Sequence, residues 1–328
     1  MPQVSIIIPI YKVEQFIQRC LQSVVNQSYK DIECILVNDV SPDNSMQIVE
    51  KFIQQNADFN FNIINHKQNA GLSVARNSGI DLAHGKYLYF LDSDDEITTN
   101  AIEHLVALAE ETQAELVIGE SICINEKENW KRNYFPINYK DNILENNVLQ
   151  EFVNGNYPVM ACDKLVRKDF LVKHKLYFVK DLFSQDVLWS FQSALYLQKV
   201  AFLRETTYLY YFHDASIIHN RGKKHFENWI TIAQYINQAY KTEQDKQRKK
   251  LIFRYLIEFK NTTLQMNWKA QKNQDLWKTS YKAYKKLNNL PFLEYLKTNY
   301  SIQTKKENLF TTLPTWFGFW LFRKRFER

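Results

Sequence analysis

Residues 4–26, VSIIIPIYKVEQFIQRCLQSVVN, set the architecture expected for this chain. Their first part, Val4–Ile8, is a β-branched run closed by Pro9, which predicts a strand buried on both faces. Apolar residues at helical spacing follow, and they predict an amphipathic helix over Val13–Asn26. A strand that leads directly into a helix is the start of a βα unit.

The same alternation continues up to about residue 120. Further strands are predicted at Glu33–Asn38, Phe61–Asn65 and Lys86–Leu91, and further helices at Ser45–Gln55 and Ser73–Ala83. Repeated βα units of this length predict a parallel sheet covered by helices. Ligands of such sheets bind at the carboxyl ends of the strands. We therefore expect residues 9–11, 38–43 and 92–95 at one edge of the sheet, which we call the carboxyl rim.

The remainder of the chain has a different pattern. The region 121–220 is less regular, with helices expected at 145–153 and 185–197 and extended segments at 157–161 and 200–212. Beyond residue 223 the pattern predicts helices at 224–241, 246–269, 272–287 and 292–300. Residues 221–328 are therefore expected to form a helical extension.

Charge separates the same two parts. Residues 1–220 carry 19 Lys and Arg against 28 Asp and Glu, whereas residues 221–328 carry 23 against 8. The net charges of −9 and +15 indicate two units with different partners. Nucleic acid and an anionic membrane surface are the two candidates for the basic part. The helices at 224–300 carry no nucleic-acid motif, so we expect no nucleic acid.

Composition narrows the class of protein. Apolar residues make up 45% and aromatic residues 15% of the chain, which excludes a disordered or fibrous protein. No apolar run is long enough for a spanning helix, and the strand at Val4 leaves no room for a signal peptide. The four cysteines form no C-x-x-C pair, which favours buried thiols in a reducing cytoplasm.

Three acids follow the apolar strand that ends at Leu91. In an extended segment residues i and i+2 point the same way, so Asp92 and Asp94 are expected to face one side together. Two carboxylates this close repel each other unless a cation lies between them. Mg²⁺ and Mn²⁺ favour carboxylates together with substrate phosphates. The alternative to a metal site is an Asp-rich turn that caps a helix near Thr98–Thr99.

Five motifs, taken in order, resemble those of glycosyltransferase family 2, the inverting GT-A-fold enzymes of bacterial polysaccharide assembly. The motifs are SIIIPIY at 5–11, VNQSY at 25–29, VNDVSPDNS at 37–45, NAGLSVARNSG at 69–79 and DSDD at 92–95. A weaker resemblance continues through 161–168, 181–189 and 208–219. The resemblance implies an α/β fold, a GT-A-type Rossmann-like nucleotide-diphospho-sugar transferase domain at 1–220. Its residues 1–120 would bind the nucleotide sugar and its residues 121–220 the acceptor.

The resemblance also implies roles at the carboxyl rim. The residues expected to contact a UDP-sugar are Pro9, Tyr11, Asp39, Arg76, Asp92, Ser93 and Asp94. Tyr11 would lie against the uracil ring, and Asp39 would accept its imide N–H. Asp94 would ligate Mn²⁺ or Mg²⁺, with Asp92 on the ribose or on a metal-bound water. Arg76 would lie near the diphosphate or hold the acidic segment.

Each of these roles has a structural alternative. Tyr11 could pack, Asp39 could cap the helix at 44–55, and Arg76 could form a structural ion pair. His213 is implied as a third metal ligand through a neutral imidazole, and the alternative is a packed or surface histidine.

Asp186 matches the family's usual general base. An acceptor hydroxyl has a pKa far above 7, so its proton must be removed as it attacks the anomeric carbon. A single displacement of this kind inverts the sugar, and a metal offsets charge on the departing diphosphate. The expected reaction moves a hexose or N-acetylhexosamine from a UDP-sugar to a glycan or lipid-linked acceptor, in capsule, lipopolysaccharide or exopolysaccharide synthesis. Alternatively, Asp186 caps its helix.

Three departures from the family pattern leave a second hypothesis open. Asn38 replaces an acid, Gln185 replaces a Glu, and Val40 replaces a Gly, so the turn at Val40 cannot need a positive φ without strain. The alternative function is a non-catalytic sugar-nucleotide-binding or membrane-associated scaffold with a decayed site. A dinucleotide-binding oxidoreductase is disfavoured because no G-x-G-x-x-G follows the first strand.

The tail at 313–328 combines aromatic residues with a cluster of cations and is too short to span a bilayer. Trp and Phe favour the headgroup boundary, and nearby Lys and Arg bind anionic lipid. We expect peripheral attachment to the inner face of the cytoplasmic membrane, where lipid-linked acceptors reside. The alternative is a tail docked into the protein's own core or into a homodimer interface.

Overall fold

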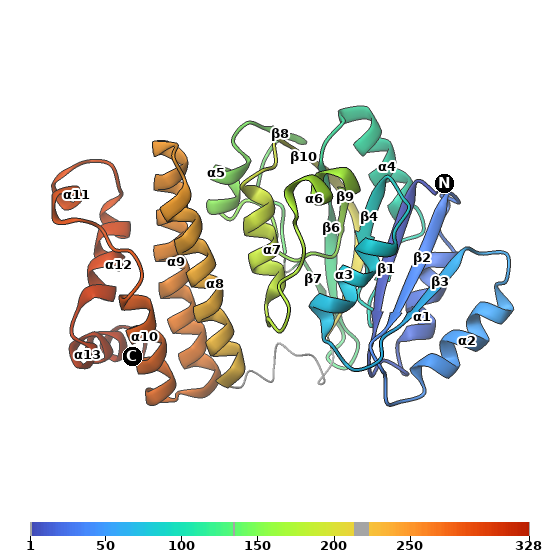
Figure 1. Ribbon diagram of the computed structural model, residues 1–328, viewed down its shortest axis with the longest axis horizontal. Coiled ribbons are helices and arrows are strands. Elements are labelled where there is room, and N and C mark those ends of the chain that lie inside the picture. The colour runs from blue at the N-terminus through green and yellow to red at the C-terminus, as the bar shows by residue number, and fades with distance from the viewer. Residues whose placement is uncertain (1, 134, 213–222, 328) are drawn as a thin grey trace. The chain divides into compact units, whose positions relative to one another are not determined.

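The computed structural model describes residues 2–133, 135–212 and 223–327 (Figure 1). The chain divides into two compact units, Met1–Asp214 and Ala215–Arg328. The first unit is built on a sheet, and the described part of the second contains only helices.

The first half of unit 1 consists of βα units. Its elements are β1 (Val4–Ile10), α1 (Ile17–Val25), β2 (Ile32–Asn38), α2 (Ser45–Gln55), β3 (Phe61–Asn65), α3 (Leu72–Leu82) and β4 (Tyr87–Phe90). The strands lie in the order β3-β2-β1-β4 and all pair in parallel. The parallel sheet predicted for this part of the chain is therefore confirmed, and its carboxyl ends meet at one rim.

The second half of unit 1 extends the sheet. Its elements are β5 (Glu96–Ile97), α4 (Ala101–Thr112), β6 (Leu116–Asn125), β7 (Trp130–Arg132), β8 (Ile143–Glu145), α5 (Val148–Val153), β9 (Lys164–Arg167), α6 (Lys168–His174), α7 (Gln185–Ala194) and β10 (Lys199–Tyr211). The order continues from β4 as β9-β6-β10-β5, and β9 is antiparallel to both of its neighbours. The complete sheet is therefore mixed.

The first strand is longer than the sequence indicated, because Pro9 lies inside it. The Ile7 carbonyl accepts from Leu91 N–H (3.1 Å), and the Ile10 carbonyl accepts from Asp39 N–H (3.1 Å). Successive strand residues alternate sides, so Pro9 faces β4 just beyond the last β1–β4 pair, Ile7 with Phe90. A proline can stand there because no pair of that ladder needs its missing N–H.

Helices cover both faces of the sheet. Ile6 and Ile8 belong to a buried cluster with apolar residues of α1, α2 and α4. Ile7 points to the opposite face, where α3 packs so closely that a Cβ at Gly79 would lie 2.3 Å from Ile7 Cγ2. Phe90 faces the same way and packs edge-on against Trp189 of α7. The strands are buried on both sides, as their apolar runs predict.

The segment at 157–161, which the sequence predicted to be extended, forms no strand of the sheet. Side chains satisfy its backbone instead. The Val159 carbonyl accepts from Ser190 Oγ (2.7 Å), and the Pro158 carbonyl accepts from Lys164 Nζ (3.0 Å). Backbone groups bonded in this way need no sheet partner. The helix expected at 145–153 begins only at Val148, because 143–145 form β8.

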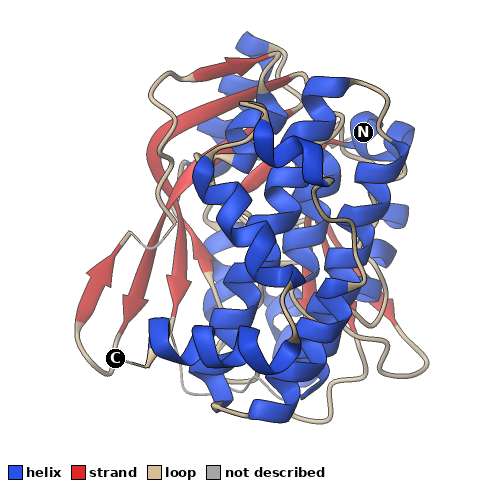
Figure 2. Cartoon of the chain, turned by 90° about the vertical axis from the view of Figure 1, so that its left-hand side faces the viewer, coloured by secondary structure: helices blue, strands red, loops and turns tan. Residues whose placement is uncertain are grey.

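The described part of unit 2 is a group of helices (Figure 2). Several aromatic rings are buried among these helices, including those of Phe253, Trp277 and Tyr281. The helices are α8 (Lys223–Thr242), α9 (Lys246–Gln271), α10 (Gln274–Lys285), α11 (Phe292–Leu296), α12 (Ile302–Thr312) and α13 (Thr315–Phe326). Side-chain oxygens of Asp245, Asn273 and Ser301 accept N–H groups at the starts of α9, α10 and α12. Such caps fix where a helix begins.

Two predictions for unit 2 need correction. The helix expected at 292–300 ends at Leu296, and the last two helices were not predicted. The tail at 313–328 is largely α13, whose Phe319 and Phe322 are buried. No helix among the described residues has the length and the apolar content that crossing a membrane requires.

Candidate active site

The acidic segment that follows β4 is fixed by neighbouring elements. Asp92 N–H donates to the hydroxyl of Tyr208 on β10 (3.3 Å). Arg19 of α1 donates from Nη2 to the carbonyl of Asp94 (3.3 Å). The carboxylate of Asp95 accepts from the Tyr208 hydroxyl (2.7 Å) and from Tyr211 N–H (2.8 Å). Asp95 therefore secures the segment, because both of its oxygens are bonded to β10.

A single buried guanidinium organises the centre of the rim. Arg76 of α3 is fully buried. Its Nη2 donates to Asp92 Oδ1 (2.7 Å) and its Nη1 donates to Asp186 Oδ1 (2.5 Å). Burial alone would lower the pKa of Arg76, but Asp186 and Asp92 outweigh it and raise the pKa above its ordinary value. The charge on Arg76 is therefore permanent, and it holds together two acids that lie far apart in the sequence.

The two acids keep one side open. The side chain of Asp92 is 27% exposed and that of Asp186 is 25% exposed, against 1% for Arg76. The second oxygen of Asp186 accepts from Ala161 N–H (3.2 Å). Asp186 is in the first turn of α7 and Ser184 occupies the N-cap position, so the capping alternative for Asp186 is wrong. Each carboxylate retains lone pairs beyond those bonded to the protein.

The donor set suits a divalent ion only in part. Burial raises the pKa of Asp92, as do the Asp94 and Asp186 carboxylates, whereas Arg76 lowers it. Within the described residues, no three His, Cys, Asp or Glu side chains converge on a metal position. Mg²⁺ commonly takes one or two carboxylates and completes its shell with water and substrate phosphates. Asp92 and Asp94 fit that pattern, and His213 lies outside the described residues.

Asp39 is buried at the end of β2 and bonded to the loop before α3. Its Oδ1 accepts from Ala70 N–H (2.8 Å), and its Oδ2 accepts from Gly71 N–H (2.8 Å). Gly71 is the N-cap of α3 with φ +86°, a conformation that favours glycine. The alternative in which Asp39 caps the helix at 44–55 is wrong, because Asp43 accepts from Ser45 N–H there.

His66 was not identified from the sequence. Its Nδ1 lies 2.8 Å from Asp39 Oδ1, and its Nε2 lies 2.9 Å from the hydroxyl of Ser78 on α3. His66 therefore shares Oδ1 of Asp39 with Ala70 N–H and links this carboxylate to α3. Its position one residue after β3, at the carboxyl rim, was the available signal.

The remaining predicted contacts differ in exposure. Tyr11 is 42% exposed, so its side chain is packed over only part of its surface. Ser93 is buried within the acidic segment, and Pro9 is buried within β1. Of these three residues, Tyr11 alone presents a large side chain to solvent at the rim.

The turn after β2 carries backbone strain. Val40 has φ +58°, a left-handed conformation that β-branched residues rarely adopt. The cost of this conformation is about 1–2 kcal/mol. Asn38 supports the turn, because its Oδ1 accepts from Ser41 N–H (3.0 Å) and its Nδ2 donates to Asn65 (2.9 Å). The strain expected if this turn required a positive φ is therefore present, next to Asp39.

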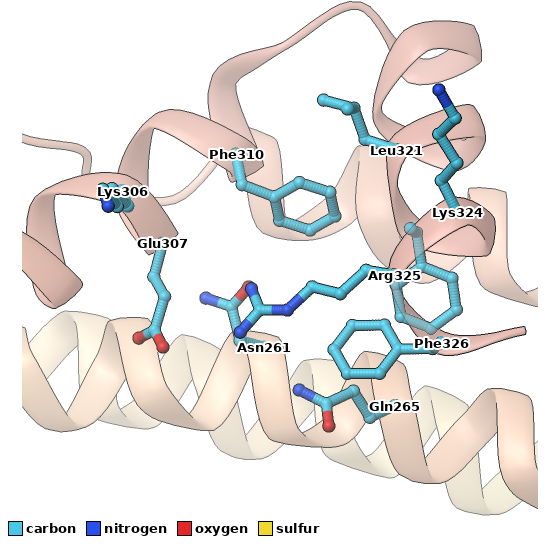
Figure 3. A pocket seen from close by; sticks show the side chains of 10 residues that line it. Asn261, Gln265, Lys306, Glu307, Phe310, Leu321, Lys324, Arg325 and Phe326 are labelled. Carbon is cyan, nitrogen blue, oxygen red and sulfur yellow. The ribbon is translucent and has the colours of Figure 1, made fainter. Parts of the chain in front are cut away.

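A groove of about 470 Å³ lies within unit 2, between α9, α12 and α13 (Figure 3). Its lining combines aromatic rings such as Phe310 and Phe326 with the cations Lys306 and Arg325. Glu307 is the one carboxylate in that lining. Without a second acid, this groove lacks the paired carboxylates found at the carboxyl rim.

Comparison with known proteins agrees with this geometry. The profile described as Glycosyl transferase family 2 matches residues 5–169. The glycosyltransferase YibD of Escherichia coli is 27% identical over 258 residues, covering 74% of this chain and 73% of that protein. A Campylobacter jejuni protein named GalNAc(5)-diNAcBac-PP-undecaprenol beta-1,3-glucosyltransferase is 27% identical, with coverages of 81% and 90%.

A solved structure has the same fold. Staphylococcus aureus TarS in complex with UDP-GlcNAc superimposes with a TM-score of 0.71 at 19% identity, covering 95% of this chain and 90% of that chain. The predicted α/β fold of GT-A type with a helical C-terminal region is therefore confirmed. A profile match from the first strand into α6, across the acidic segment and the Arg76 motif, places this chain in glycosyl transferase family 2.

Proposed function

We propose that this protein is an inverting glycosyltransferase that moves a sugar from a UDP-sugar to a hydroxyl of a glycan or lipid-linked saccharide in bacterial surface-polysaccharide synthesis. The observation that carries the proposal is the bridge from Arg76 to Asp92 and Asp186. This bridge joins Asp92, which follows β4, to Asp186, which lies on α7, and the side chains of both acids are partly exposed. The names of the Campylobacter and Staphylococcus relatives, with their undecaprenol-linked substrate and bound UDP-GlcNAc, agree with a UDP-sugar and a lipid-linked acceptor.

Asp186 is the general base in this proposal. Its carboxylate takes the proton of the acceptor hydroxyl while the hydroxyl oxygen bonds to the anomeric carbon. The bond from that carbon to the diphosphate breaks, and UDP leaves. Arg76 acts as a positioning residue. Its bonds to Asp186 and Asp92 fix the distance between the general base and the acid that lies beside the donor.

The donor occupies the carboxyl rim. Asp39 retains a lone pair on Oδ2 beside its bond from Gly71, so it can accept the imide N–H of uracil. Tyr11 is exposed and free to cover the base. Asp92 and Asp94 would hold Mn²⁺ or Mg²⁺ together with the diphosphate. When bound, the ion offsets negative charge on the departing phosphate.

A donor screen tests the function. UDP release from a panel of UDP-sugars is measured in the presence of a lipid extract of bacterial membranes, which supplies lipid-linked saccharide acceptors. Each donor is assayed with and without Mn²⁺. We expect release with one donor class, loss of release on chelation, and a fall of about 10²–10⁴-fold in Asp186→Asn. Asp31→Asn is the matched control, because Asp31 is an exposed acid at the amino end of β2, away from the rim.

Two results would contradict the proposal. Undiminished transfer in Asp186→Asn would exclude it as the base. UDP-sugar binding without any transfer, in every donor and acceptor combination, would favour the sugar-nucleotide-binding scaffold.

The same function calls for contact with the membrane that holds a lipid-linked acceptor. We extend the proposal to peripheral attachment through the tail at 313–328, on the cytoplasmic side. Trp316 and Trp320 on α13 are exposed, and three cations lie in its last turn. Tryptophan rings and cations of this kind bind the boundary of an anionic bilayer.

A further inference from the structure

We propose that α11 is a second membrane-inserting element, which acts together with the exposed face of α13 on bilayers that contain anionic lipid. The inference rests on the proposed attachment of the tail and adds a contact that the sequence did not indicate. In this proposal the exposed faces of α11 and α13 contact lipid rather than another protein.

The apolar side chains of α11 point into solvent. Phe292 is 78% exposed, Leu293 65% and Leu296 74%. No residue of α11 is buried. Single exposed apolar residues are ordinary, but three large ones on one five-residue helix form a patch that needs an explanation.

This exposure is held in place by the rest of unit 2. Tyr295 packs against the cluster of Phe253, Ile257 and Leu290. Its hydroxyl accepts from Asn308 (2.5 Å), and its carbonyl accepts from Lys305 Nζ (3.0 Å). Because Tyr295 anchors the inner side of α11, the apolar residues on either side of it are directed outward. The element therefore presents its apolar side chains from a fixed base.

The acid on α11 is neutralised locally. The carboxylate of Glu294 accepts from Lys297 Nζ (2.8 Å) and from Asn299 (2.8 Å). These bonds lower the pKa of Glu294 and pair its charge. Its repulsion from an anionic surface is correspondingly reduced.

α13 likewise has one buried face and one exposed face. Phe319 and Phe322 pack on Trp268 and Trp277, which fixes the inner face. Gly318 permits this approach, because a Cβ there would lie 2.6 Å from the Tyr281 hydroxyl. The sequence left two alternatives for the tail, which were docking into the protein's own core and exposure to a membrane. One face of α13 is docked and the opposite face is exposed. α11, α12 and α13 all lie on the same side of the α8–α9 pair (Figure 1).

Charge decides between lipid and a second copy of the chain. Residues 221–328 carry 23 Lys and Arg against 8 Asp and Glu. Two such units face to face repel each other, whereas an anionic bilayer attracts each of them. Apolar residues that enter the headgroup region then add to the binding in proportion to the area they bury.

Vesicle sedimentation of the full chain tests the inference. The vesicles are phosphatidylcholine alone and phosphatidylcholine mixed with phosphatidylglycerol. We compare the wild type with an α11 triple variant (Phe292→Ser, Leu293→Ser and Leu296→Ser) and an α13 double variant (Trp316→Ser and Trp320→Ser). Tyr235→Ser on α8 is the control, because Tyr235 is an exposed aromatic residue of the same unit.

We expect the wild type and Tyr235→Ser to bind the anionic vesicles preferentially. The α11 and α13 variants should each bind at least about tenfold more weakly, since they remove three and two large apolar side chains, respectively, from the bilayer. Circular dichroism melts should be unchanged, because the substituted residues are exposed in the free protein.

The contrary outcomes separate the two proposals. Full binding by the α11 variant with loss in the α13 variant overturns this inference and leaves the tail attachment standing. No binding by the wild type overturns both, while transfer to a soluble acceptor still tests the catalytic proposal. A wild-type dimer that becomes monomeric in the α11 variant, with vesicle binding unchanged, assigns the surface to a second copy and also overturns the inference.

Discussion

The two units of this protein use charged and apolar residues in opposite ways. Unit 1 buries charge at its carboxyl rim, where Arg76 is bonded to two acids and where Asp39 and Asp95 each accept hydrogen bonds on both oxygens. Unit 2 leaves large apolar residues in solvent on α11 and α13. A buried charge is held in one place by its partners, whereas an exposed apolar group gains free energy only when something covers it. The first arrangement suits positioning and the second suits contact with another surface.

Removing the buried cation gives the sharpest test of unit 1. Arg76→Met leaves Asp92 and Asp186 without their shared partner, and we expect the free energy of unfolding to fall by about 3 kcal/mol. The surface pair of Arg167 with Asp169 provides the matched control, and Arg167→Met should cost less than about 1 kcal/mol. Urea unfolding followed by circular dichroism measures both. Equal effects of the two substitutions would show that the buried bridge does not hold the rim.

The two faces of α13 can be separated in unit 2 by stability. Phe322 is buried among aromatic rings, so Phe322→Ala should cost about 3–5 kcal/mol. Trp316 is 71% exposed, so Trp316→Ala should change stability by less than about 0.5 kcal/mol. Five of the seven tryptophans lie in residues 215–328, so tryptophan fluorescence during urea unfolding reports mainly on this unit. A large cost for Trp316→Ala would mean that its face is already packed.

Unit 2 also buries a charged residue, because the side chain of Lys260 is fully buried. Buried charge is therefore not confined to unit 1. Burial lowers the pKa of Lys260 to about 7, against about 10.4 for an ordinary lysine. Between these values the unfolded chain binds more protons at this position than the folded chain does. The free energy of unfolding should therefore rise with pH from about 7 towards 10, by about 1 kcal/mol per unit, and level off below about pH 7.

Urea midpoints across that range measure the effect. Lys260→Met should reduce the slope but not remove it, because burial also lowers the pKa of Lys164 in unit 1, to about 8. Lys282→Met, at an exposed position, should keep the full slope. A slope that is the same in all three proteins would assign the pH dependence to other groups.

The strained turn beside Asp39 gives the smallest expected effect. Val40→Gly relieves about 1–2 kcal/mol of left-handed strain but loses about 0.5–1 kcal/mol in chain entropy. The variant should therefore be more stable than the wild type by about 0.5–1 kcal/mol in urea unfolding. Val172→Gly, at an exposed position inside α6, should instead cost about 1 kcal/mol. Loss of stability in both variants would mean that Val40 is unstrained.

Several features of the site followed from local sequence. The alternation of buried strands and amphipathic helices predicted the parallel half of the sheet, because a strand and a helix each have a period that the sequence displays directly. The same periodicity predicted that the acids after β4 and the residues after β1 and β2 would meet at one rim. The turn at Val40 could also be judged from sequence, because the missing glycine implied strain wherever φ had to be positive.

Only the tertiary structure shows which side chains of the carboxyl rim bond to one another. Arg76 and Asp186 are separated by 110 positions, and no local pattern shows that one guanidinium would bond to both Asp186 and Asp92. The hydrogen bonds of His66 to Asp39 and Ser78 depend likewise on where β3 and α3 come together. The exposure of α11 was hidden because its apolar residues predict burial unless the packing of Tyr295 is known. Sequence fixes each element's period and chemistry, whereas the partner of a side chain depends on packing between segments distant in the chain.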